Sequence, residues 1–125
     1  MANFYWITIM NDKSTDKKQR ILDATMELIA ENGLHATPMS QVSKRSGVSA
    51  GAIYNYFSSK EEIINHLYLE LKEKLTEEVF KNYDKNAPYK ERIFRIWRNT
   101  YAFMAKNPGK LSFMEQCANS PSIME

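Results

Sequence analysis

The stretch that most constrains the fold is residues 37–60, TPMSQVSKRSGVSAGAIYNYFSSK. Thr37 can cap a helix, and Pro38 can occupy its first position, where the missing N–H leaves no hydrogen bond unmade. Val42 is the apolar anchor of this short helix. Gly47 can adopt the left-handed conformation that ends a helix in a sharp turn. The pattern predicts a short helix that stops abruptly.

A second short helix is predicted for residues 50–56, with Ser49 as its cap. Ile53 and Phe57 are spaced by four, so both can reach the core from one face of the helix. Val48 fills the turn between the helices as an apolar plug. Two short helices around a three- or four-residue glycine turn make a helix-turn-helix, whose second helix enters the major groove of DNA.

The local charge favours a nucleic-acid partner. Residues 33–60 contain three cations, Lys44, Arg45 and Lys60, and no Asp or Glu, whereas the chain after Lys60 carries ten cations and ten anions. The overall net charge of +2 is therefore uninformative, and the clustering is what counts. The small side chains of residues 50–52 would let the second helix approach a groove wall closely.

The sequence GVSAGAIYNYFSSKEE at residues 47–62 resembles the recognition-helix signature of tetracycline-repressor-like (TetR-family) transcriptional regulators. The resemblance extends back through ILDA at residues 21–24 and Asn-Gly at residues 32–33. It implies a sequence-specific regulator, most often a repressor, that binds a palindromic double-stranded DNA operator as a homodimer. It also implies that helices behind the DNA-binding part enclose an effector.

The same resemblance implies which positions face DNA. Ser40 stands where family members often carry an arginine that reads guanine, which puts that contact in doubt here. Ala50 can offer only its methyl group, to a thymine, while Asn55 is the side chain best equipped for a bidentate adenine contact. Tyr54 has the alternative of lying partly in the core. The full predicted set is Thr37, Ser40, Ser49, Ala50, Gly51, Tyr54, Asn55, Tyr56 and Lys60.

Ser59 and Glu62 have the spacing of a capping box, in which the serine bonds the N–H of Glu62 and Glu62 reaches back. This fixes the start of a helix predicted to run to about Tyr83. A start at this place would aim free N–H groups and Lys60 at a DNA phosphate.

Before the motif, Thr15 or Asp16 is expected to cap a helix that runs to about Asn32 and ends at Gly33. Its apolar stripe has helical period and consists of Ile21, Ala24, Thr25, Leu28 and Ile29. Lys17, Lys18 and Arg20 in its first turns are either a solvated face or phosphate contacts. Residues 1–11 are expected to be a non-native or disordered leader, and a minor-groove arm is disfavoured because they contain no Lys or Arg.

Two more helices are predicted, at about residues 88–106 and 110–118, separated by a strong stop at Asn-Pro-Gly. The fold class is therefore all-α, with a three-helix DNA-binding domain at residues 12–60 packed on the start of the helix 61–83. Residues 61–125 are expected to be the N-terminal part of a ligand-binding and dimerisation domain, truncated, because wide apolar faces would need further helices or a second copy to cover them.

Aromatic and methionine side chains of the later helices are mostly packing residues in this interpretation. Through the resemblance, some would contact a small apolar or aromatic effector: Tyr68, Trp97, Tyr101, Met104, Phe113 and Met114.

Other chemistry is disfavoured by the residues. The two histidines, His35 and His66, have no carboxylate or cysteine at ligand spacing, so neither a metal site nor a cofactor is expected. The single cysteine, Cys117, is expected to be a buried thiol in a chain suited to a reducing cytoplasm. No transmembrane span and no enzyme motif is apparent. A helical protein-interaction module remains the alternative function, and an enzyme or carrier has only aromatic content to support it.

Overall fold

The computed structural model describes the backbone of residues 2–120 and the side chains of residues 16–120. Within this range all regular structure is helical, as predicted. The helices are α1 (Ala2–Asn32), α2 (Met39–Ser46), α3 (Ala50–Tyr56), α4 (Lys60–Val79), α5 (Tyr89–Lys106) and α6 (Pro108–Ala118). Two compact units divide the chain, residues 1–64 and residues 65–125, and α4 crosses from one to the other.

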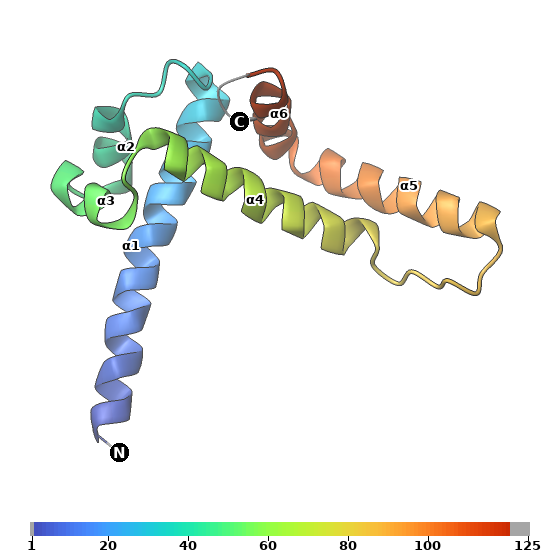
Figure 1. The fold of residues 1–125 in the computed structure, drawn as a ribbon, viewed down its shortest axis with the longest axis horizontal. Coiled ribbons are helices and arrows are strands. Elements are labelled where there is room, and N and C mark those ends of the chain that lie inside the picture. Colours follow the sequence, from blue (N-terminus) through green and yellow to red (C-terminus); the bar gives the residue numbers. More distant parts are fainter. Residues whose placement is uncertain (1, 121–125) are drawn as a thin grey trace. The chain divides into compact units, whose positions relative to one another are not determined.

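In the first unit, α2 and α3 pack on each other and on α1 (Figure 1). The predicted stripe of α1 is buried, and so are the anchors of the two short helices and the first turns of α4. The buried apolar side chains of the first unit are Ile21, Leu22, Ala24, Leu28, Ile29, Leu34, Val42, Val48, Ile53, Phe57, Ile63 and Ile64. The helix-turn-helix therefore rests on a single apolar core contributed by four helices.

The predicted start of the first helix is wrong, whereas its end is confirmed. The helix begins at Ala2 and not at Thr15 or Asp16, so it continues through most of residues 1–11. That residues 1–11 are non-native or disordered stays a prediction. At the other end, Gly33 has φ 88° and its N–H donates to Ile29 O at 2.9 Å, which terminates the helix after Asn32.

The predicted cap of α2 is also wrong. Pro38, and not Thr37, is the N-cap residue, and no side chain bonds the free N–H groups of this helix. Thr37 is fully buried, and its Oγ1 donates to Gly33 O at 2.9 Å. The threonine hydroxyl therefore stabilises the connection between α1 and α2 rather than the end of α2.

The turn between α2 and α3 is held by Arg20 of α1. Gly47 adopts φ 71°, the left-handed conformation predicted for it. The Nε and Nη2 atoms of Arg20 donate to Ser46 O at 3.0 and 2.7 Å, which satisfies a carbonyl that the end of α2 leaves free. Ser43 Oγ donates to Val48 O at 2.7 Å, and Val48 is buried. The turn is thus bonded to both α1 and α2.

The second short helix is confirmed at both ends. Ser49 Oγ accepts from Ala52 N at 3.2 Å, as a cap does, and α3 ends at Tyr56. Ile53 and Phe57 are buried, as their spacing predicted. Packing from one face of so short a helix leaves its other face in solvent.

The capping box at the start of α4 is confirmed in one half. Ser59 Oγ accepts from Glu62 N at 3.2 Å. The Glu62 carboxylate reaches back one residue further than predicted, and accepts from the backbone N–H and the hydroxyl of Ser58. The carboxylate therefore fixes the link that follows α3 as well as the start of α4.

In the second unit, α4 ends at Val79, four residues before the predicted end, and a turn-rich segment leads to α5 (Figure 1). α5 begins at Tyr89 after Pro88, close to the predicted start. Asn99 Nδ2 donates to Val79 O and Lys81 O, both at 3.1 Å. These bonds tie the middle of α5 to the end of α4.

The predicted stop between α5 and α6 is reduced to one residue. Asn107 is the C-cap residue of α5 and occupies the N-cap position of α6 without a side-chain cap bond. Pro108 is the first residue of α6, two residues before the predicted start. The end of α6 at Ala118 is confirmed. Cys117 is fully buried, and burial raises the pKa of its thiol to about 11. The expectation of a buried thiol is confirmed.

Two glycines of the helix-turn-helix make a matched pair for testing the turn. A Cβ on Gly47 would lie 2.7 Å from Arg20 Nη2, whereas a Cβ on Gly51 would meet nothing within 4 Å. We expect Gly47→Ala to lower the free energy of unfolding by about 1–3 kcal/mol, because it combines a left-handed alanine with the displacement of Arg20. Gly51→Ala should leave it unchanged or raise it by up to about 1 kcal/mol. Urea unfolding of the two variants checks this, and equal losses would contradict the role of the turn.

Candidate DNA-binding surface

The outward face of α3 carries most of the predicted DNA contacts. Ala50, Gly51 and Asn55 are exposed, and Tyr54 is 54% exposed, which excludes its alternative placement in the core. The Asn55 amide makes no hydrogen bond within the described residues, so both its donor and its acceptor are available to a base edge. The structure thus presents one free amide beside an open, small-residue helix start.

Other predicted residues differ in what they can offer. Ser40 and Ser49 are exposed, Tyr56 is half-buried, and Lys60 is half-buried in the first turn of α4. Thr37 is the exception, because its side chain is fully buried and bonded to Gly33 O. A contact between the Thr37 side chain and DNA is therefore not available in this conformation.

The charge of this unit is more balanced than the sequence around the motif suggested. Arg45 is held by α1: its guanidinium bonds Glu31 at 2.9 Å through two nitrogens and lies 3.3 Å from Glu27. The hydrogen bond from Arg45 lowers the pKa of the Glu31 carboxyl, and the pKa of Arg45 is raised in turn. Across residues 16–64 there are six cations and six anions. Attraction for phosphate must therefore come from individual free cations.

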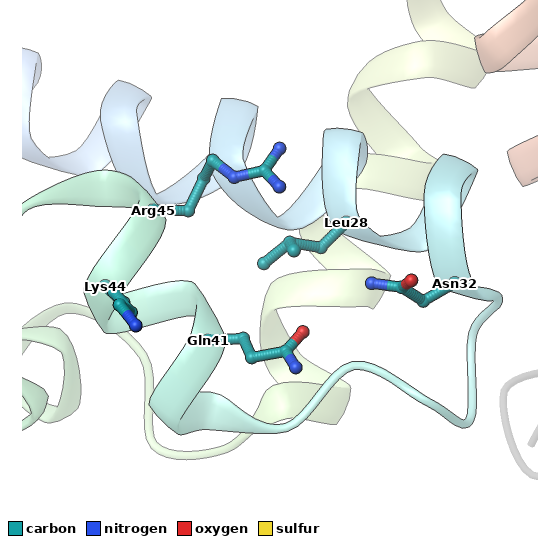
Figure 2. Close-up of a pocket in the computed structure, with 5 residues that line it drawn as sticks. All are labelled: Leu28, Asn32, Gln41, Lys44 and Arg45. Carbon is teal, nitrogen blue, oxygen red and sulfur yellow. The ribbon is translucent and has the colours of Figure 1, made fainter.

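Lys44 and Lys60 are such cations, because neither forms an ion pair within the described part of the chain. Lys44 lies at a shallow hollow of about 650 Å³ between α1 and α2, which Figure 2 shows with Leu28, Asn32, Gln41 and Arg45 around it. Lys44 is one of the three cations of residues 33–60, but it is not among the predicted DNA contacts. Its exposure makes Lys44 a further candidate for a phosphate contact.

Two basic residues of α1 have roles that the sequence did not predict. Arg20 is exposed on α1, as a residue of a solvated face would be, but its guanidinium also bonds the carbonyl that ends α2 and lies 3.8 Å from Asp16. The ammonium of Lys18 lies 5.7 Å from the centroid of the Phe57 ring, at cation–π distance. Both side chains position the turn and α3, and no sequence motif signals this because the partners are backbone and ring atoms far along the chain.

The predicted effector-binding residues do not share one environment. Trp97 and Tyr101 stack at a ring-centroid distance of 6.0 Å and are 65% and 66% exposed. Phe113 is fully buried, while the rest of the set is half-buried: Tyr68, Met104 and Met114. The exposed pair belongs to a face of α5 that also carries Tyr89, Ile93 and Phe94 in solvent.

In the described residues, no group of three metal-ligating side chains comes together. None of the helices in that same range combines the length and apolar composition needed to cross a bilayer.

The fold and this surface define a helix-turn-helix protein. Residues 21–67 match the family described as bacterial regulatory proteins, tetR family, and the chain belongs to that family. A crystal structure of a TetR-family transcriptional regulator from Haemophilus influenzae superposes with a TM-score of 0.74 at 30% identity, over 87% of this chain and 60% of that one.

Two curated relatives agree with this placement. An uncharacterized HTH-type transcriptional regulator of Haemophilus influenzae is 29% identical over 93% of this chain and 62% of its own length. The fatty acid metabolism regulator protein of Bacillus subtilis is 34% identical over 71% of this chain and 46% of its own length. The chain thus spans between about half and three fifths of these relatives.

Proposed function

We propose that this chain binds specific double-stranded DNA through α3 and its flanking residues, as the DNA-binding part of a ligand-responsive repressor. The observation that carries the proposal is the outward face of α3, where the unpaired amide of Asn55 lies beside small, exposed residues at the helix start. Its opposite face is buried, so α3 is held firmly enough to be presented to a groove. Selection of bound sequences from a random duplex pool tests this, and no enriched sequence would contradict it.

Further parts of the proposal concern partners. TetR-family regulators typically act as dimers, and a two-fold dimer would place two copies of α3 on palindromic half-sites about 34–36 Å apart. We propose a small apolar or aromatic effector near Tyr68, Trp97, Tyr101, Met104, Phe113 and Met114, and a cytoplasmic, non-enzymatic protein. The alternative function, a helical protein-interaction module, predicts no salt-dependent binding to any duplex.

Lys60→Ala should weaken binding to all duplexes about equally. A lysine–phosphate contact releases roughly one counterion, so the slope of log K against log salt should fall in magnitude by about one. Lys85→Ala is the matched control, because Lys85 is an exposed lysine in the segment between α4 and α5. Fluorescence anisotropy at several salt concentrations gives both slopes, and a Lys60 slope equal to that of the control would exclude the phosphate contact.

Asn55→Ala should relax sequence preference at one base-pair position and weaken the preferred site by about 1–3 kcal/mol. Gln19→Ala removes an amide of α1 that bonds Asp23 at 2.9 Å, and should leave DNA binding unchanged. Competition with single-substituted duplexes measures the effect position by position. Uniform weakening at every position would make Asn55 a backbone contact instead.

The chain should self-associate through the exposed face of α5, because Trp97 and Tyr101 leave a large apolar area in water. We expect Trp97→Asp with Tyr101→Asp to reduce association, and Leu69→Asp, at an exposed leucine of α4, to have little effect. Sedimentation equilibrium at tens of micromolar compares the variants. A stable monomer at this concentration would contradict this expectation.

A further inference from the structure

The second unit contains a positively charged cleft that plays no part in the proposed DNA binding. The cleft has a volume of about 460 Å³ and lies between the C-terminal half of α4 and the region where α5 meets α6. Four lysines line it, Lys74, Lys81, Lys106 and Lys110, against a single carboxylate, Glu78. The chain after Lys60 has equal numbers of cations and anions, so this is a local excess of positive charge.

These charges have no partners of their own. None of the four ammonium groups forms an ion pair or a hydrogen bond within the described residues, and neither does the Glu78 carboxylate. Like charges gathered around one hollow repel one another, and an anion entering it would relieve that repulsion while gaining charge-assisted hydrogen bonds. The positive charge of the four lysines is therefore available to attract an anionic ligand.

A helix end adds to the same cleft. Asn107 and Lys110, from the first turn of α6, form part of its wall. No side chain caps α6, and the amide nitrogen of Asn107 donates to Phe103 O at 2.8 Å. The N–H groups of Lys110 and Leu111 donate to Asn107 O, both at 3.1 Å, so this end of α6 contributes to the cleft the positive end of its dipole rather than a set of free donors.

Hydrogen bonds from α5 hold one wall of the cleft, the segment that follows α4. Asn99 Nδ2 bonds both Val79 O and Lys81 O, and Arg95 Nη1 donates to Asn82 O at 2.6 Å. These bonds fasten the segment that carries Lys81 to α5. The backbone around Lys81 would therefore need little ordering on binding, which favours affinity.

We propose that this cleft binds a small molecule that carries two or more phosphate groups. Lysine ammonium groups are compact point charges that suit phosphate oxygens, and four of them match a ligand of charge about −3 to −4. The volume falls within the range of small-molecule sites. The half-buried ring of Phe103 supplies an apolar wall for the remainder of the ligand. This inference does not depend on DNA binding by α3.

The test is isothermal titration calorimetry of the full chain at about 50 mM salt, with ATP and inorganic pyrophosphate as probes and sulfate as a simple dianion. We expect both probes to bind and sulfate to bind much more weakly. The double variant Lys106→Gln, Lys110→Gln should bind each probe about tenfold or more weakly than the unchanged chain does. Lys85→Gln with Lys90→Gln removes the same charge from exposed lysines outside the cleft and should change affinity less than about twofold.

Glu78→Gln supplies a change in the opposite direction. It removes the one carboxylate of the cleft, so both probes should bind several-fold more tightly. Circular dichroism verifies that each variant is folded.

Three results would overturn the proposal: no binding of either probe, equal losses in the two double-lysine variants, or sulfate binding as tightly as pyrophosphate. A fourth is loss of duplex DNA binding alone in the Lys106→Gln, Lys110→Gln variant, which would make the cleft a nucleic-acid contact. Failure of DNA binding by α3 is measured separately with Asn55→Ala, so the two outcomes are distinguishable.

Discussion

The helix-turn-helix depends on one backbone carbonyl, that of Ser46. It ends α2, and without a partner it would face the low-dielectric packing between the first helices, where an unmade hydrogen bond is costly. Arg20 bonds it twice from α1, and Gly47 leaves room for the guanidinium because it has no side chain. The direction of α3 after the turn therefore follows from a contact between residues 26 positions apart.

Local signals in the sequence predicted much of the first unit. The caps and anchors of α3 depend on neighbours within four residues, so Ser49, Ile53 and Phe57 could be assigned from spacing alone. Thr37 could not, because a threonine before Pro is equally suited to capping the next helix or to bonding back to the preceding turn. Which alternative occurs is decided by the burial that α1 imposes.

Electrostatics was the least predictable property of the candidate site. The absence of acids from residues 33–60 suggested a positive surface, but Glu27 and Glu31 reach Arg45 from the outward side of α1. Their spacing of four places them on one face of a helix, yet nothing local indicates that Arg45 of α2 lies opposite. Charge counted along the chain thus differs from charge displayed in space, and the same is true of the lysine cleft of the second unit.

The single residue between α5 and α6 also limits how these helices can move. Asn107 belongs to the end of one and the start of the other, with φ −133° and ψ 60°, and its amide bonds Phe103 O. A joint of one residue has only two soft dihedral angles, and here the side chain restrains the joint as well. A rotation of α5 would accordingly rotate α6 as well, because no flexible linker separates the two helices.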